Sequence, residues 1–452
     1  MFNCTLNLSV MDEEIFCARL RQFCERLTGE RAAIIGLIRL SGGASMESWS
    51  FDYAGHGYVL RRAASAELMA GRAFGHDVEA ALVQAARTAG VKAPEVIGVL
   101  CGDDGLGTGY LMRRVEAEVN PARILSNAAP GLIENIATEL ATIHQIRPRD
   151  DIAIPILNIA SALADLKARF QDYGGDRPVI ALAIRWCEDH LPPPVLPVLV
   201  HGDFRLGNIM VDENGLAAVL DWELAHWGDP HEDLAWGCVG AWRFANYHQP
   251  AFGLAGFETY FAAYEAATGA PVDRTRFRFW LIYRTLWWAI GCLQMAETWR
   301  SGADRSLERA VIGRRTSENE VDLLLLLEEQ MDAGTGALSL PMEEQRQRGE
   351  PSASELLQAV SEWIATDVKA HVMGREKFMA AVAINALGIV QRELAHPVEP
   401  FDHALCEEIF AGRVTFATPG LLEKLRGQML AKLGTDVPKY PALVVAREKW
   451  SQ

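Results

Sequence analysis

Cysteine is sparse in this 452-residue chain, and the cysteines that are present form no framework. The eight residues are scattered, no two of them form a Cys-x-x-Cys pair, and most lie in apolar segments. Thiols in that pattern are typical of small buried side chains in a reducing compartment. Without clustered ligand spacing, a structural zinc site is also disfavoured. We therefore expect a cytoplasmic protein without disulfides.

Positive charge is also in short supply. The chain has 43 Lys and Arg residues against 59 Asp and Glu residues, which gives a net charge of −16. A general nucleic-acid binder needs a basic surface, so the composition disfavours this class of protein. An anionic substrate is compatible with the composition, because a local basic patch can exist in an acidic protein.

The sequence predicts no apolar run of membrane-spanning length, and the N-terminus has no basic leader. Three acidic residues, Asp12, Glu13 and Glu14, instead follow the short apolar start. We therefore expect neither a signal peptide nor a membrane partner. Half of the residues are apolar and 8% are aromatic, which is ample for roughly two or three domains with large cores.

One polar stretch organises the middle of the chain. Its sequence is His201-Gly202-Asp203-Phe204-Arg205-Leu206-Gly207-Asn208, and apolar runs at 195–200 and 209–211 flank it. A further apolar run at 216–220 leads into Asp221-Trp222-Glu223. This pattern predicts a strand, a polar loop, and a hairpin that ends in an acidic tip.

The polar residues of this stretch suit metal-dependent phosphoryl transfer. Asp203 is the candidate base that orients a hydroxyl, and Asn208 and Asp221 are candidate Mg²⁺ ligands, because Mg²⁺ prefers hard oxygen donors. Arg205 could reach the transferred phosphate. Any one of these residues alone would more often cap a loop. The combination His-x-Asp-x-x-x-x-Asn, a hairpin and a further Asp favours the catalytic interpretation.

A possible phosphate-covering sheet precedes this stretch. The segments 34–40, 46–53 and 58–60 read as strands, and the last is followed by Arg61 and Arg62. The first two are joined by Ser41-Gly42-Gly43-Ala44-Ser45, whose glycines would let backbone N–H groups approach phosphate oxygens. A glycine-rich hairpin is more often only a turn, and the downstream catalytic loop is what favours a phosphate role.

The rest of the chain has a mainly helical pattern. The whole sequence predicts four segments. Residues 1–117 are expected to form a β-rich lobe with helices, 118–335 a helical lobe that carries the polar stretch, 336–350 a linker, and 351–452 an all-α appendage of unknown role. The polar residues of the appendage are expected on solvated helix faces.

The sequence resembles the aminoglycoside phosphotransferase-like small-molecule kinases. It is most similar to the subgroup resembling kinase domains fused to, or encoded beside, acyl-CoA dehydrogenases, some of which carry a helical C-terminal domain. The resemblance covers roughly residues 34–331. Its motifs are His201–Asn208, Asp221-Trp222-Glu223, Asp229-Pro230 with Asp233-Leu234-Ala235, Ser41–Ser45, Tyr58–Arg62, Tyr110–Glu116 and Leu140–His144.

This resemblance implies an α+β, bilobal protein-kinase-like fold with ATP in the cleft. Asp203 is then the catalytic base, Asn208 and Asp221 bind Mg²⁺, and Asp233 is a structural acid that steadies the catalytic loop. The nucleotide would be bound by the remaining matched positions, which are Ser41, Gly42, Gly43, Ser45, Arg61, Glu79, Met112 and Arg114. Arg61 stands where the family has a lysine, and Glu79 is the best match for its partner.

The resulting functional hypothesis is an ATP- and Mg²⁺-dependent kinase of a small-molecule hydroxyl. The subgroup implies a hydroxyacyl-CoA-type acceptor, whereas the acidic composition would also suit an aminoglycoside-like cation. A catalytically weak binding or scaffold protein is the alternative, because Arg61 replaces the lysine. A protein acceptor is disfavoured, since Asp229-Pro230 follows Asp221 too closely for a long peptide-docking segment. The oligomeric state is left open.

Overall fold

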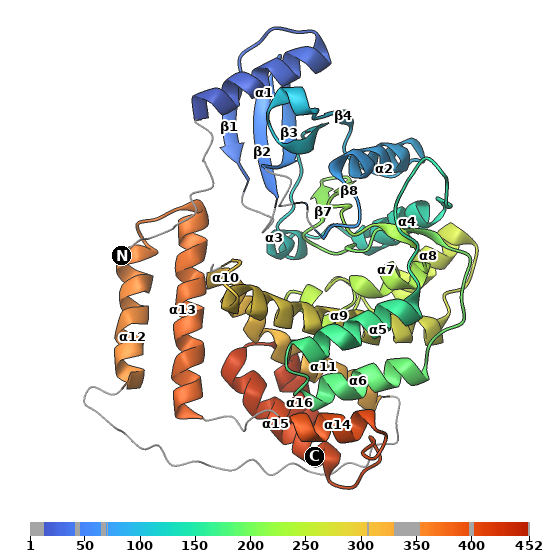
Figure 1. Ribbon diagram of the computed structural model, residues 1–452, viewed down its shortest axis with the longest axis vertical. Coiled ribbons are helices and arrows are strands. Elements are labelled where there is room, and N and C mark those ends of the chain that lie inside the picture. Colours follow the sequence, from blue (N-terminus) through green and yellow to red (C-terminus); the bar gives the residue numbers. More distant parts are fainter. Residues whose placement is uncertain are drawn as a thin grey trace. The chain divides into compact units, whose positions relative to one another are not determined.

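The computed structural model of the chain describes residues 13–40, 46–64, 69, 71–304, 307–329, 353–396 and 402–450 (Figure 1). It consists of two compact units. The first comprises Met1–Ile156, Leu196–Asp233 and Ala266–Gly269, and the second comprises Leu157–Val195, Leu234–Glu265 and Ala270–Gln452. Each unit has its own architecture and is described separately.

The first unit contains a five-stranded antiparallel sheet with the strand order β1-β2-β3-β5-β4. The strands are β1 (Ile35–Arg39), β2 (Glu47–Tyr53), β3 (His56–Ala63), β4 (Val96–Val99) and β5 (Thr108–Arg113). The strand predicted at 58–60 is longer than expected, because Arg61 and Arg62 pair with β2 and β5 as part of β3. Arg61 is therefore fixed by the sheet.

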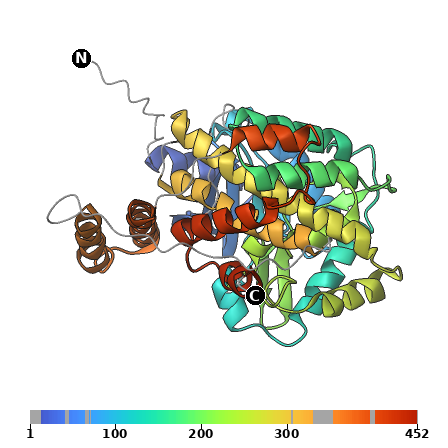
Figure 2. The ribbon, with the colours of Figure 1, turned by 90° about the horizontal axis from the view of Figure 1, so that it is seen from below.

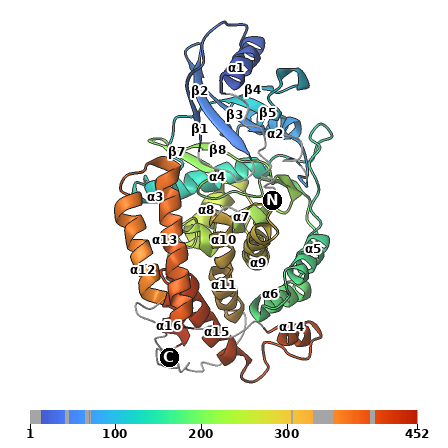
Figure 3. The ribbon, with the colours of Figure 1, turned by 60° about the vertical axis from the view of Figure 1, so that its left-hand side comes forward.

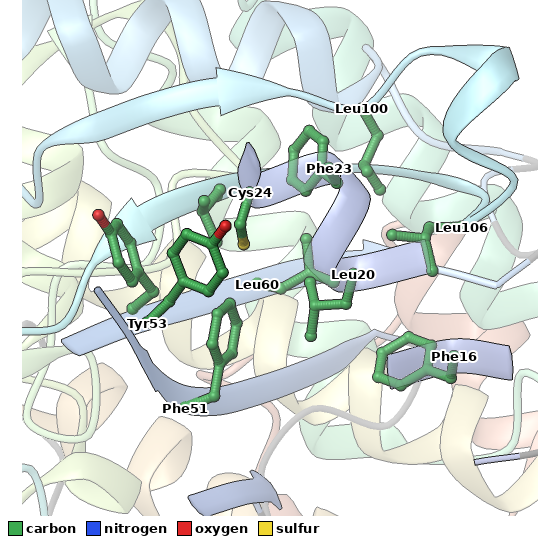
Figure 4. Packing of buried hydrophobic residues seen from close by; sticks show 11 residues of the cluster. Phe16, Leu20, Phe23, Cys24, Phe51, Tyr53, Leu60, Leu100 and Leu106 are labelled. Carbon is green, nitrogen blue, oxygen red and sulfur yellow. The ribbon is translucent and has the colours of Figure 1, made fainter. Parts of the chain in front are cut away.

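Helix α1 (Glu13–Thr28) covers one face of this sheet. Apolar residues at helical spacing over 12–27 predict this helix, and the prediction is confirmed. Phe16, Leu20 and Phe23 recur on one side of the helix and pack against Phe51 and Leu60 (Figure 4). Aromatic side chains of this size bury a large apolar area, which is the main stabilising contribution to such a core.

The rest of the first unit consists of short helices and two small ribbons. Strand β6 (Val198–Val200) pairs with β9 (His226–Gly228), and β7 (Ile209–Asp212) pairs with β8 (Gly215–Val219). The helices are η2 (Gly102–Asp104), α2 (His76–Thr88), α3 (Pro121–Ser126), α4 (Leu132–His144) and the start of α7 (Pro230–Trp236). The predicted strand–loop–hairpin pattern around His201–Asn208 is confirmed.

The described part of the second unit is helical. Its elements are α5 (Ile159–Asp172), α6 (Pro178–Asp189), η3 (Gly240–Trp242), α8 (Phe257–Thr268), α9 (Arg274–Arg300), α10 (Leu307–Arg314), α11 (Thr316–Glu328), α12 (Ala353–Trp363), η4 (Ile364–Val368), α13 (Gly374–Ala395), α14 (His403–Phe410), α15 (Leu421–Asp436) and α16 (Pro441–Trp450). The sequence pattern predicts one helix over 306–331, and this prediction is wrong, since Arg315 separates α10 from α11.

Helix α11 is buried on almost all sides, and the helices near the C-terminus help to cover it (Figure 3). Arg426 and Lys432 of α15 are 5% and 9% exposed and pair with Glu328 and Glu320 of α11. The prediction that polar residues after 351 lie on solvated faces is therefore wrong for these two. The four-part division of the chain stays a prediction, and residues 336–350 lie outside the described residues.

Helices α12 and α13 pack side by side (Figure 2, orange-brown). Among the described residues, α13 is long and apolar enough to cross a membrane, judged by length and composition. The prediction that no run reaches this length is corrected by this helix. Length and composition do not by themselves place a helix in a bilayer, because core helices of soluble proteins meet the same criterion.

Candidate active site

The polar loop between β6 and β7 gathers three predicted residues around one carboxylate. Asn208 donates from Nδ2 to Oδ2 of Asp203 at 2.5 Å and to the Asp203 carbonyl oxygen at 3.0 Å. Arg205 donates from Nε to Oδ1 of Asp203 at 2.9 Å. The nitrogen end of the Asn208 amide is thus occupied, which leaves its oxygen end for another donor or a cation.

The buried carboxylate of Asp233 fixes the backbone at the start of this loop. Asp233 is fully buried and accepts the backbone N–H groups of His201 at 2.6 Å and Gly202 at 2.9 Å. Burial alone would raise the pKa of Asp233, but His144 and His201 hold this pKa below its usual value. Asp233 therefore stays ionised, as the role predicted for it requires.

The backbone at the start of the loop requires glycine. Gly202 has a φ of +79°, and a Cβ there would lie 2.4 Å from the carbonyl oxygen of Leu224. His201 beside it is buried, and burial lowers the pKa of its ring. Its Nδ1 accepts the N–H of Asp203, and its Nε2 lies 3.0 Å from the carbonyl oxygen of Leu220. A neutral His201 with its proton on Nε2 satisfies both contacts and fixes the loop.

Asp221 follows β8 in an unusual conformation. Its φ is +66°, in the left-handed region that non-glycine residues seldom adopt. The neighbouring Leu220 N–H donates to the carbonyl oxygen of Asn208 at 2.8 Å, so the ends of the two segments are tied together. Strained backbone of this kind persists where the surroundings enforce it, and it is common at functional sites.

Arg61 connects the sheet to this acidic tip. Its Nη2 donates to Asp221 at 2.7 Å and to Glu223 at 2.5 Å, and its Nε lies 3.2 Å from Glu79. Burial alone would lower the pKa of Arg61, but the surrounding carboxylates raise this pKa above its ordinary value. Tyr110 donates to Glu79 at 3.0 Å. The guanidinium is therefore a permanent cation among three acids.

A model of the phosphotransferase enzyme family matches residues 36–280, which is more than half of the chain. The chain belongs to this family. The matched range includes the His201–Asn208 loop, Asp221 and Arg61.

Comparison with known proteins agrees with this assignment. The phosphotransferase is 28% identical over 268 residues to acyl-CoA dehydrogenase family member 10 of Mus musculus, covering 53% of this chain and 24% of the relative. It is 26% identical over 232 residues to family member 11 of Gallus gallus, covering 48% and 30%. The aligned region thus spans less than a third of either relative. The resemblance to kinase domains associated with acyl-CoA dehydrogenases is confirmed.

Structure comparison identifies the fold. A crystal structure from Ralstonia eutropha, described as that of a candidate aminoglycoside phosphotransferase, superposes with a TM-score of 0.53 at 20% identity. The match covers 70% of this chain and 98% of that one. The predicted α+β, kinase-like fold of the phosphotransferase is therefore confirmed.

The predicted nucleotide-binding residues have three different outcomes. Arg61 and Glu79 do come together, as the motif match predicts. Met112 lies on β5 opposite Val59, whereas Arg114 is engaged by Asp52 of β2 at 2.8 Å and by Glu116. Ser41, Gly42, Gly43 and Ser45 lie outside the described residues.

Two residues of the site were missed or undervalued in the sequence. Arg72 donates to Glu223 at 2.8 Å, and no motif singles it out. In the sequence, Glu223 stands out only as part of the Asp221-Trp222-Glu223 motif, but in the fold it bridges Arg61 and Arg72. The Asp-Trp-Glu motif was the one available signal for Glu223, and Arg72 had none.

Proposed function

We propose that this phosphotransferase transfers the γ-phosphoryl group of ATP to a hydroxyl of a small molecule in a Mg²⁺-dependent reaction. The observation that carries the proposal is the braced loop that presents Asp203 and Asn208 beside Asp221. Phosphoryl transfer needs little covalent chemistry from a protein, and positioning with charge neutralisation supplies most of the rate enhancement. A rigid loop that carries an acid and an amide fits this demand.

Asp203 has the environment of a hydroxyl-orienting base. Asn208 and Arg205 hold its carboxylate in one orientation, so the acceptor hydroxyl would meet a fixed oxygen. When the phosphoryl group leaves ATP, the O–P bond to the acceptor forms and the hydroxyl proton passes to Asp203. Arg205 pairs with this carboxylate and would stabilise charge on the transferred group.

The donor set suits magnesium. The amide oxygen of Asn208 and the carboxylate of Asp221 are hard oxygen ligands, and two such ligands leave positions for water and phosphate oxygens, which Mg²⁺ prefers. Bound there, the ion would neutralise charge on the β- and γ-phosphates. Asn208, whose nitrogen is held by Asp203, would present only its oxygen to the metal.

The short connection after Asp221 favours a small acceptor. β9 begins at His226 and already pairs with β6, and α7 follows at Pro230. No long segment is available there to dock a peptide. The names of the relatives support a hydroxyacyl-CoA-type acceptor, and an aminoglycoside-like cation is the alternative favoured by the net charge of −16.

The test is a substrate-dependent ADP-release assay in which hydroxyacyl-CoAs are compared with aminoglycosides. Asp203→Ala should reduce turnover by at least ~10²-fold without unfolding the protein, because it removes the base. Asp212→Ala, at an exposed aspartate of the nearby hairpin, should leave turnover unchanged. Chelation of Mg²⁺ should abolish activity, and its addition should restore activity.

Two results would contradict the proposal. Wild-type turnover in the Asp203→Ala protein would show that Asp203 is not the base. If calorimetry detects no binding of Mg·ATP at millimolar nucleotide, the rival interpretation as a scaffold is favoured, in which Arg61 keeps Asp221 and Glu223 paired permanently.

A further inference from the structure

The second unit contains a cavity of about 480 Å³. It is lined by the segment after η3 and by α8, α9 and α11. All of its lining residues belong to this one unit. The volume lies in the range of small-molecule sites in proteins. The chemistry of its walls, floor and rim decides what it can hold.

The walls of the cavity are aromatic. Phe261 and Phe277 are almost fully buried, with ring centroids 4.7 Å apart in an edge-on arrangement. Phe257 lies 5.3 Å from Phe277, and the half-buried Tyr247 completes the set. Such walls offer a ring-shaped ligand a large apolar contact area at fixed geometry.

One of the residues that line the cavity, at what we call its floor, is the buried acid Asp322. Asp322 is 4% exposed, and Tyr440, just before α16, donates to its Oδ2. Its Oδ1 is buried and has no hydrogen-bond partner among the residues that the structure describes. An unsatisfied buried acceptor costs stability, so a ligand that donates to it gains the missing bond. Burial raises the pKa of Asp322 to about 7.

The nearest buried cation does not satisfy this oxygen. Arg243 donates through Nε and Nη2 to the carbonyl oxygen of Cys238, at 3.0 and 2.8 Å, and through Nη1 to that of Tyr247 at 3.2 Å. Its charge nevertheless acts on Asp322. A ligand ammonium beside Asp322 would share this carboxylate with the charge of Arg243, which weakens the attraction that a cationic ligand would otherwise gain.

The charged residues at the rim of the cavity form ion pairs of opposite charge. Arg274 pairs with Glu258 at 3.2 Å, and Arg278 pairs with Glu329 at 2.9 Å. Each of these rim arginines therefore already has a carboxylate, and an anionic ligand would have to displace one. The rim favours neither sign of ligand charge.

We propose that this cavity binds a neutral small molecule with an apolar ring body and a hydroxyl group that donates to Oδ1 of Asp322. The ring lies against Tyr247, Phe257 and Phe277, and the hydroxyl reaches the floor. The site involves none of the residues assigned to phosphoryl transfer, so the proposal does not depend on the proposed function.

Four probes with one ring system and different head groups test the ligand class on the full chain. They are 2-naphthalenemethanol, 2-methylnaphthalene, 2-naphthoate and 2-naphthalenemethylamine, and binding is followed by saturation-transfer NMR and probe fluorescence. The alcohol should bind saturably. The methyl compound should bind roughly tenfold more weakly, because it leaves Oδ1 unpaired. Both charged probes should also bind more weakly than the alcohol.

Variants test the place of binding. Tyr247→Ala and Phe257→Ala, at half-buried walls that the fold should tolerate losing, should each weaken the alcohol several-fold. Tyr173→Ala, at a half-buried tyrosine outside the cavity, should not weaken it. The Asp203→Ala protein should bind the alcohol like wild type, which separates this proposal from the kinase proposal.

The proposal is overturned if the alcohol does not bind saturably, or if a charged probe binds as tightly as the alcohol. It is also overturned if the methyl compound matches the alcohol, or if folded Tyr247→Ala and Phe257→Ala proteins both bind with wild-type affinity.

Discussion

At the scale of single residues, the decisive feature of the candidate active site is the arginine at position 61. A single Nη2 contacts both Asp221 and Glu223, while Nε faces Glu79. A guanidinium can do this because its donors form a rigid planar fork, whereas a lysine ammonium is a point charge on a flexible stem. Arg61 would therefore compete with a metal ion for the Asp221 carboxylate.

Replacement of Arg61 by lysine should release Asp221. A lysine paired with the buried Glu79 cannot also span both outer carboxylates. The Asp221 side chain is 31% exposed, so the lost ion pair is worth only about 0.5–1 kcal/mol. We expect the Mg²⁺ concentration for half-maximal activity to fall about two- to fivefold at saturating ATP. Arg113→Lys, on the same sheet, is the matched control. A higher Mg²⁺ requirement in Arg61→Lys would show that Arg61 assists metal binding instead.

The sequence predicts the residues of the site that follow short spacing rules and misses those that do not. Asp203 and Asn208 lie five positions apart on one loop, so a local pattern can identify them. Arg72 and Glu223 are separated by 151 positions, and only the folded chain brings them together. The Arg61–Glu79 pair was predictable because a family motif, and not local periodicity, supplied both positions.

At the scale of elements, α11 shows where pattern reading fails. Its sequence from Thr316 to Glu328 contains four acids, which ordinarily indicate a solvated face, yet the helix is buried. The cations and donors that make this possible come from other elements, such as Arg177 for Glu320 and Trp450 for Glu328. The start of one helix follows a local rule, because Asp followed by Pro favours a helix N-terminus. Asp229 accepts the N–H of His231 at 3.0 Å and starts α7 as the Asp-Pro pair suggests.

The buried acid Asp322 on this helix should make stability depend on pH. Burial raises its pKa from 3.8 to about 7, although Tyr440 and Arg243 lower it, and Glu318 raises it further. Between these two pH values the native state binds more protons than the unfolded chain, so stability falls as pH rises. Asp322→Asn is neutral at every pH. Its stability relative to wild type should therefore increase by roughly 2–3 kcal/mol between pH 5 and pH 8.

Urea unfolding at both pH values measures this change. Asp172→Asn, at an exposed aspartate of α5, should show no comparable trend. If the relative stability of Asp322→Asn is the same at pH 5 and pH 8, the carboxyl of Asp322 ionises normally in the folded protein.

At the scale of the whole molecule, the range matched by the family model and the range of the second compact unit end at different residues. The family model ends at residue 280, but the second unit continues to the C-terminus. The family resemblance implied the kinase-like fold, and sequence patterns implied a helical C-terminal part. They could not show that the C-terminal helices cover α11, because this depends on contacts between residues about a hundred positions apart, such as Glu328 and Arg426.

A chain that ends at Glu329 should therefore fail to fold as a soluble monomer. It would remove the α15 and α16 partners of Glu328 and the Tyr440 hydroxyl that donates to Asp322, whereas Glu320 would lose Lys432 but keep Arg177. Each uncompensated buried charge costs roughly 3–5 kcal/mol, against a total stability of about 5–15 kcal/mol for a domain. Circular dichroism and size-exclusion chromatography would report the loss.

As a control, a full-length chain cut at a protease site inserted in 336–350 should stay associated, because contacts and not the covalent link hold the pieces. A cooperatively melting monomer from the truncated chain would show instead that α12–α16 form a dispensable appendage.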